Sequence, residues 1–158
     1  MQFFFFKPTV LALSSAVLLT AGTTLLADPK PKNSTPADPL VIHKKYNGNT
    51  WNWSQGASYW GKKGVFQAVW KGTSYGEGKW YVTNKGTLCY EAHWHWKKDG
   101  IPASDQIKRC WQHVVDADGN LWQRNHEKED WYQPSSDKIK RGNKLKSEFR
   151  KIEKNVGS

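Results

Sequence analysis

The sequence has few cysteines and few methionines, and its middle part has few aliphatic residues. It contains two cysteines, Cys89 and Cys110, and one methionine. Leucine, isoleucine and valine are sparse between Tyr46 and Tyr132, whereas all ten tryptophans and all six tyrosines lie in that stretch. A core built there must therefore be filled largely by aromatic side chains.

Recognisable catalytic motifs are also missing. There is no Gly-rich phosphate loop, no His-Glu-x-x-His and no convincing carboxylate pair. Ser54, Ser58, Ser74 and Ser104 lie in no nucleophile-elbow context. In "DADG", residues 116–119, the glycine comes two positions too early for a calcium loop, so a hairpin turn is expected there. The sequence favours a non-enzymatic protein without a cofactor, although a triad assembled across strands would not be visible in it.

The first 27 residues have the order of a secretory signal peptide. One basic residue, Lys7, precedes a run of apolar and small residues, and charge begins at Asp28. The run is too short and too rich in Ser, Thr and Gly for a membrane span. We expect export to the periplasm or the extracellular space, with no transmembrane span after cleavage. Residues 28–39, which hold four prolines, predict a flexible or extended tether.

Residues 40–136 predict a Trp-rich all-β domain. Short runs rich in Trp, Tyr, Val and Thr recur every ten to fifteen residues, with turn signals such as "NKG" and "DADGN" between them. No segment before residue 135 keeps a helical period. The expected fold is a small antiparallel meander of six to eight strands, closed as a barrel or folded as a sandwich, with a basic C-terminal helix or edge strand.

The stretch "LCYEAHWHW", residues 88–96, predicts one strand of a disulfide-bonded hairpin. Alternation places Leu88, Trp94 and their neighbours on one face, and Cys89 on the other. When Cys89 is set opposite Cys110, the apolar faces of the two strands match. Two cysteines in an exported protein are expected to oxidise. We therefore predict a structural disulfide between them.

A metal site on this strand is not favoured. Glu91, His93 and His95 would lie in a line about 13 Å long, because same-face neighbours on a strand are about 6.8 Å apart. One zinc ion, bound at about 2 Å, cannot collect all three. His93 and His95 are the only weak candidates, and the disulfide register puts His113 on the opposite face.

Ten tryptophans exceed what a small β core can bury with every N–H satisfied. Trp80, Trp94 and Trp111 lie within expected strands and are expected in the core. Aromatic residues near turns or at the ends of the β region are the better candidates for exposure and for stacking on a ligand. The candidate ligand-binding residues are Trp51, Trp53, Tyr59, Trp60 and Trp131.

The basic C-terminal segment, residues 137–158, carries eight basic and three acidic side chains. Leu145, Phe149, Ile152 and Val156 follow a helical period. We favour a helix or last strand that docks these residues while its lysines face water, over an amphipathic basic helix that contacts anionic lipid, polysaccharide or nucleic acid. Candidate contacts to an anionic surface are Lys138, Lys140, Arg141, Lys144, Lys146, Arg150 and Lys151.

Several stretches together resemble one bacterial family. They are "YNGNTWNW", "YGEGKWYV", "GTLCYEAHW", "CWQHVVDADGNLWQR" and "DWY". In this order they are similar to the family called domain of unknown function 995, which comprises small exported proteins. The family pattern falls here on Trp51, Gly56, Tyr59, Gly78, Trp80, Cys89, Trp94, Cys110, Trp111 and His113. The resemblance implies export, the disulfide and a single β domain, and it supplies no catalytic or binding residue.

The first functional hypothesis is a non-enzymatic module associated with the cell envelope. Exposed aromatic residues would bind a glycan or lipid, and the positive surface would hold the protein near anionic envelope components. Nucleic acid is not expected as a partner of an exported protein. The alternatives are a carrier with an apolar barrel interior and an enzyme of unknown chemistry. A pocket lined by several tryptophans would distinguish the carrier from a surface binder. The oligomeric state is left open.

Overall fold

The computed structural model describes residues 28–157. The signal peptide expected for residues 1–27 lies outside them. The elements are β1 (Thr35–Pro36), α1 (Pro39–Tyr46), β2 (Asn49–Asn52), β3 (Gly56–Trp60), η1 (Lys62–Gly64), β4 (Val65–Trp70), β5 (Ser74–Val82), β6 (Thr87–Lys98), β7 (Ile101–Val115), β8 (Leu121–Asn125), η2 (Ser136–Lys138), β9 (Ile139–Arg141) and α2 (Lys146–Gly157). Neither helix of this part of the chain is long and apolar enough to cross a membrane.

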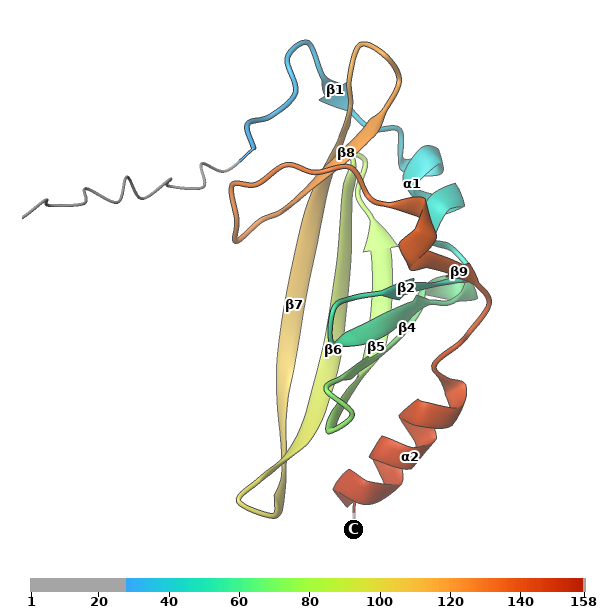
Figure 1. The fold of residues 1–158 in the computed structure, drawn as a ribbon, viewed down its shortest axis with the longest axis vertical. Coiled ribbons are helices and arrows are strands. Elements are labelled where there is room, and N and C mark those ends of the chain that lie inside the picture. Colours follow the sequence, from blue (N-terminus) through green and yellow to red (C-terminus); the bar gives the residue numbers. More distant parts are fainter. Residues whose placement is uncertain (1–27, 158) are drawn as a thin grey trace, which may run out of the picture.

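The strands form one antiparallel sheet in the order β1-β7-β6-β5-β4-β3-β2-β9, and β8 pairs with β7 (Figure 1). The predicted all-β meander is confirmed, since β2 to β7 are neighbours in sequence and in the sheet. The sheet is neither a closed barrel nor a sandwich. It has nine strands rather than six to eight, because the short β1 and β9 come from Pro-rich and basic segments without an alternating apolar pattern.

A helix, α1, lies between β1 and β2, and the sequence pattern did not predict it. The Asp38 carboxylate accepts a hydrogen bond from Leu40 N at 2.8 Å, and Pro39 occupies the first helical turn. These two features favour the start of α1 at this point. Of the residues in α1, only Ile42 and Tyr46 are buried. With two buried residues in about two turns, the sequence shows no helical hydrophobic period. The end of the expected tether is also ordered, because Thr35–Pro36 pairs with β7.

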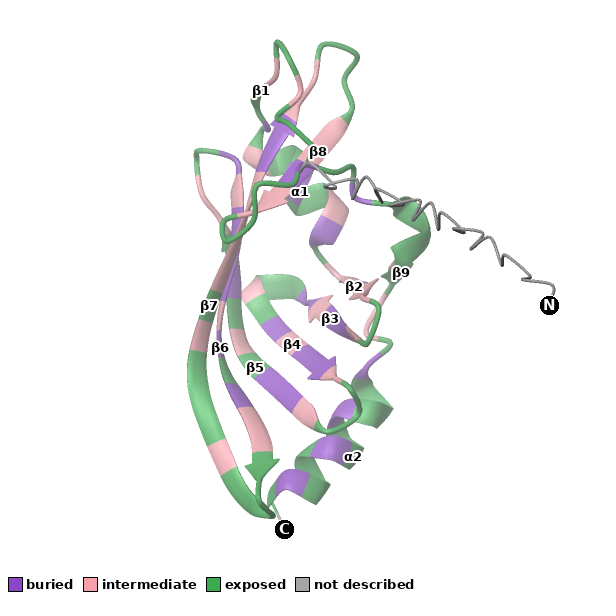
Figure 2. Ribbon diagram, turned by 60° about the vertical axis from the view of Figure 1, so that its left-hand side comes forward, coloured by how far each residue is buried: buried purple, intermediate pink, exposed green. Residues whose placement is uncertain are grey.

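Alternation along the strands separates two apolar layers. Figure 2 shows where buried residues lie along the strands and along α2. The first, which we call the cavity face, carries Trp60, Phe66, Trp80, Tyr90 and Trp94 and packs on α1. The second, the helix face, is covered by α2. The split predicted for residues 88–96 is confirmed, since Leu88, Tyr90, Ala92 and Trp94 are all buried in the first layer.

Two glycines in β5 allow the strands beneath the cavity face to approach closely. A Cβ at Gly78 would lie 2.1 Å from Glu91 O, and a Cβ at Gly76 would lie 2.7 Å from the Trp94 ring. Gly76 therefore makes room for an indole that packs directly over the β5 backbone. At position 78 any side chain would collide with the backbone of β6, so a glycine there allows β5 and β6 to pair.

The basic C-terminal segment forms both an edge strand and a helix, the two structures expected for it as alternatives. Ile139–Arg141 adds the edge strand β9 to β2, and Lys146–Gly157 forms the helix α2. Leu145, Phe149, Ile152 and Val156 are buried against Ala57, Val69 and Tyr75, and the Phe149 and Tyr75 rings meet edge to face at 5.0 Å. The docked helix is confirmed. Its apolar stripe is occupied by the sheet and is not available to a lipid surface.

Candidate ligand-binding cavity

A cavity of about 550 Å³ opens on the cavity face. Because the sheet curls, strands from both of its ends reach this space. Its wall is aromatic and its rim is polar. The lining residues are Trp51, Asn52, Trp53, Ser54, Trp60, Trp70, Leu88, Trp111, Gln123, Asn125, Lys128, Asp130, Tyr132, Gln133, Ser135 and Lys138.

The wall consists of five indoles that come from strands β2, β3, β4 and β7 and from the β2–β3 turn. Trp60 is 2% exposed, and its ring lies edge to face with the Trp111 ring at 6.2 Å. Trp53 and Trp70 are tilted against each other at 5.9 Å. Trp51 stacks on Tyr46 of α1 at 5.1 Å. These contacts hold the rings of Trp51, Trp60 and Trp111 in place, so most of the wall is formed before any ligand arrives.

The rim is made by the segment that follows β8. Lys128, Asp130, Gln133, Ser135 and Lys138 line the cavity, and the rim faces solvent. Tyr132 anchors this segment through a backbone bridge to Gln123, with Gln123 N donating to Tyr132 O at 2.8 Å. The cavity thus has an apolar interior and a charged, solvent-facing mouth.

A buried polar network stands behind the wall. Tyr46 Oη lies 2.8 Å from Gln123 Oε1, to which it donates, and 3.1 Å from His113 Nε2. His113 Nδ1 lies 3.0 Å from Trp111 O. A carbonyl only accepts, so the N–H of a neutral ring is on Nδ1, and Nε2 is an acceptor. The Tyr46 hydroxyl proton therefore has two acceptors, and the network ties α1 to β7 and β8.

Burial controls the protonation of this network. Desolvation lowers the pKa of His113 to about 4, although hydrogen bonds to Trp111 and Gln123 oppose the shift. Burial also raises the pKa of Tyr46 well above its usual value. Both side chains are uncharged at neutral pH. His113 is absent from the cavity lining, so its position favours a structural role over that of an acid–base group for a bound molecule.

Two buried donors near the cavity lack partners among residues 28–157. Neither Trp60 Nε1 nor Gln123 Nε2 donates a hydrogen bond of standard geometry. The Gln123 side chain does lie near the Tyr132 hydroxyl, where it opposes the rise in the pKa of Tyr132 that burial causes. Both residues line the cavity. A buried donor without a partner costs free energy, and an acceptor oxygen of a bound molecule would remove that cost.

The structure brings three of the five candidate ligand-binding residues together. Trp51, Trp53 and Trp60 line the cavity. Tyr59 points to the helix face and packs beside the α2 layer. Trp131 is 4% exposed and lies outside the lining, below the Arg124 guanidinium at 5.4 Å. The predicted exposure is wrong for Trp60 and Trp131, since a position near a turn does not decide which face a ring occupies.

Sequence reasoning missed Trp70, Gln123 and Tyr132 as lining residues and assigned Trp111 to the core. Trp111 is half-buried, with one side on the cavity. The available signal was strand parity. Trp60 pairs with Phe66, so Trp70 falls on the same face as Trp60, and Trp111 pairs with Leu88. That signal requires the strand register, which the sequence revealed only for the β6–β7 pair.

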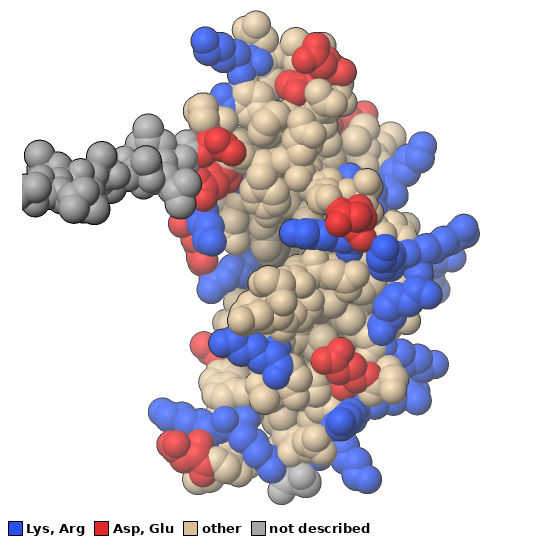
Figure 3. All heavy atoms as spheres, viewed as in Figure 1, with Lys and Arg blue, Asp and Glu red and all other residues tan. Residues whose placement is uncertain are grey.

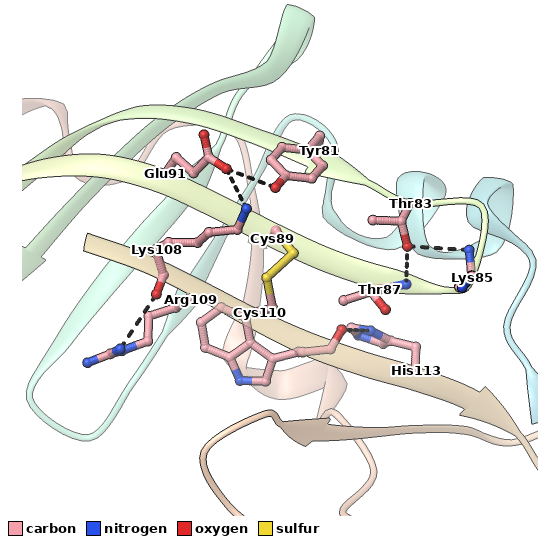
Figure 4. The surroundings of a disulfide bond; sticks show 11 residues. Tyr81, Thr83, Lys85, Thr87, Cys89, Glu91, Lys108, Arg109, Cys110 and His113 are labelled. Atoms are coloured by element: carbon pink, nitrogen blue, oxygen red, sulfur yellow. Dashed lines mark hydrogen bonds and ion pairs between the residues drawn. A yellow bond between two sulfur atoms is a disulfide. The ribbon is translucent and has the colours of Figure 1, made fainter. Parts of the chain in front are cut away.

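The predicted disulfide is confirmed on the opposite face. Cys89 and Cys110 are cross-strand partners, with their sulfur atoms 2.09 Å apart (Figure 4). Beside them Glu91 accepts hydrogen bonds from Lys108 at 2.7 Å and from Tyr81 at 2.9 Å. The Lys108 contact is the main cause of the lowered pKa of Glu91 and of the raised pKa of Lys108.

The two candidate metal ligands are also on this face. His95 stacks on Tyr75 at 4.7 Å, and its Nε2 lies 4.0 Å from Glu77 Oε1. The His93 and His95 rings are 6.5 Å apart. His113 is on the cavity face, as the register predicts. Within residues 28–157 no three His, Cys, Asp or Glu side chains are placed to hold a metal ion.

Basic side chains gather along the side of the molecule where β9 and α2 lie (Figure 3). We call this the basic edge. Within residues 28–157 none of its members forms an ion pair with a carboxylate. The members are the seven residues Lys138, Lys140, Arg141, Lys144, Lys146, Arg150 and Lys151.

The comparisons with known proteins agree with the resemblance seen in the sequence. A family model described as "Protein of unknown function (DUF995)" matches residues 11–154. Comparisons with curated proteins and with solved structures found no match. The matched range contains every strand of the sheet and the whole cavity lining.

Proposed function

Because this chain belongs to the DUF995 family, whose description assigns no activity, we propose its function from its own cavity. The protein binds a small amphipathic molecule, with the apolar part against the tryptophan wall and the polar part at the rim. The observation that carries the proposal is an aromatic cavity of about 550 Å³ lined by five indoles. Ligand sites in proteins have volumes of roughly 300–1,000 Å³ and are mostly apolar with a few polar groups.

This proposal favours the carrier hypothesis over the surface binder. A surface binder would present its aromatic rings flat on one exposed side. Here Trp51, Trp53 and Trp60 turn inward around one space, and Trp131 is buried elsewhere. The apolar interior that the carrier hypothesis requires would be supplied by one open curled sheet and the segment after β8, instead of by a closed barrel.

The rim supplies the polar specificity of the site. Lys128 and Lys138 provide two cations there against one carboxylate, Asp130. A polar or anionic head group would meet this net positive mouth. The unpartnered Trp60 Nε1 would favour a ligand that carries an acceptor oxygen close to its apolar part.

Export is part of the same proposal. A disulfide between the two cysteines supports an oxidising compartment. The leader-like order of residues 1–27 supports passage to that compartment through a signal peptide. We assign the binding role to the periplasm or the extracellular space.

The test is a titration of the purified oxidised protein with 1-naphthoate, a compact aromatic anion, followed by tryptophan fluorescence. We expect saturable binding that Trp51→Ala and Trp111→Ala each weaken at least tenfold, because each substitution removes part of the wall. Trp122→Ala is the matched control, since Trp122 bonds Asp116 and lies outside the lining. Unsaturable binding, or equal loss in all three variants, would contradict the proposed site.

The basic edge supports a second role, which is attachment to an anionic envelope surface. Seven cations without carboxylate partners among residues 28–157 give this side of the molecule a positive field. Such attachment requires no insertion of α2. It would hold a carrier close to the surface from which its ligand comes.

A further inference from the structure

A second cavity has a volume of about 530 Å³ and shares no lining residue with the first. It is lined by the β4–β5 turn, by β6 and β7, and by the end of α2. Its apolar lining residues are Trp94, Trp96, Ile107, Ile152 and Val156. The proposed function makes no use of this space, whose polar lining includes one charged residue, Lys97.

The two cavities share a partition of stacked indoles. Trp53 lines the first cavity and Trp94 the second, and their rings are stacked with centroids 6.5 Å apart. That separation is close to the upper limit for aromatic pairs, about 7 Å.

One side of the partition is attached to a turn rather than to a strand. Trp53 follows the last residue of β2, and its N–H donates to Gly56 O at 2.8 Å across the turn. Trp94 lies in the middle of β6, with its ring pressed over Gly76. Movement of the partition is thus expected at Trp53, since turns move more easily than paired strands.

We propose that the ligand is a single-chain anionic amphiphile whose chain passes Trp53 and occupies both cavities. The inference rests on the proposed function and names its ligand class. The head group lies at the rim with Lys128 and Lys138, and the chain runs along the first wall into the space between Trp96 and Ile107. Two apolar cavities separated by one pair of rings would accommodate an extended chain, whereas a compact molecule would fill only the first.

The test uses a chain-length series of fatty acids, octanoate to tetradecanoate, below their micellar concentrations, with 1-naphthoate as a probe of the first cavity. We expect tetradecanoate to bind at least tenfold more tightly than octanoate. Ile107→Trp, which fills the second cavity, should reduce tetradecanoate binding to the octanoate level and leave 1-naphthoate binding unchanged. Ile101→Trp is the matched control, as Ile101 is 69% exposed in the same strand and lines neither cavity.

The outcomes separate the two proposals. If 1-naphthoate binds and affinity does not increase with chain length, the spanning chain is refuted and the first cavity stands. The spanning chain is refuted in the same way if Ile107→Trp and Ile101→Trp behave alike. If neither 1-naphthoate nor any fatty acid binds, both proposals fail. The wild-type series decides the question even if Ile107→Trp does not fold.

Discussion

At the scale of single residues, His113 makes stability depend on pH. The ring is fully buried, its pKa is lowered to about 4, and the unfolded value is 6.5. Above pH 6.5 both states are neutral and the network is at full strength. Below pH 6.5 the unfolded state takes up a proton first, so stability falls until pH 4, by about 3 kcal/mol in total.

Urea unfolding of the wild type and of His113→Gln between pH 4 and 8 measures this effect. The variant should be less stable at pH 7.5, because it breaks the contacts to Tyr46 and Trp111. Its stability should decline less steeply from pH 6.5 to 4, because no buried imidazole remains to be protonated. Parallel pH profiles for the two proteins would show that His113 is not the titrating group.

Gly78 is the residue at which the sheet tolerates a side chain least. Gly78→Ala would place a Cβ 2.1 Å from Glu91 O and 2.6 Å from Ala92 Cα, both backbone atoms. We expect a loss of about 3 kcal/mol, at the upper end of what overpacking costs, seen as a lower Tm in circular dichroism. Gly157→Ala meets nothing within 4 Å and should leave the Tm nearly unchanged. An equal Tm for both variants would mean that β5 and β6 can separate at no cost.

At the scale of elements, the β6–β7 hairpin depends on its cross-link. The disulfide joins residues 21 positions apart in the sequence. Closing a loop of this length adds about 3 kcal/mol to the free energy of unfolding on the chain-entropy model. Reduction should therefore lower the urea midpoint of the wild type. The Cys89→Ala/Cys110→Ala variant should match the reduced wild type and should not respond to reductant. A wild-type midpoint unaffected by reduction would assign the stability of the hairpin to its ladder alone.

The elements also show which parts of the fold are visible in the sequence. Alternation in residues 88–96 and the two cysteines predict the β6–β7 register, and the helical period of residues 145–156 predicts α2. The helix α1 escaped detection because it buries two residues and starts at a proline. The edge strand β9 has three residues and no apolar pattern, so only its pairing with β2 defines it.

The cavity was less predictable than the sheet. Its tryptophans come from four strands and one turn, and each faces inward only because of a register set by partners far away in the sequence. Trp70 joins the wall because β4 pairs with β3, and Trp111 joins because β7 pairs with β6. Turn proximity favoured both Trp53, which lines the cavity, and Trp131, which is buried outside it, since the local sequence does not determine which way the sheet curls.

At the scale of the whole molecule, the basic edge predicts salt-sensitive attachment to anionic surfaces. The protein should bind phosphatidylglycerol vesicles at about 50 mM NaCl and be released at about 500 mM, because exposed charges are screened by salt. Replacing Lys140 and Arg141 with Gln should weaken vesicle sedimentation more than the same change at Lys85 and Lys98. These two are also exposed but belong to neither β9 nor α2. Equal loss in the two variants would indicate that only net charge matters.

The strand order has a consequence for the time course of folding. Pairings from β2 to β7 join neighbours in sequence, so they can form hairpin by hairpin as the chain is synthesised. The pairing of β7 with β8 is equally local, whereas the other contacts join distant segments, since β1 pairs with β7, β9 pairs with β2, and α2 covers Ala57, Val69 and Tyr75. A nascent chain that has not yet released Phe149 to Val156 therefore exposes one complete apolar face. Until these residues emerge, the unfinished sheet is a target for chaperones, and the docking of α2 follows the formation of the hairpins.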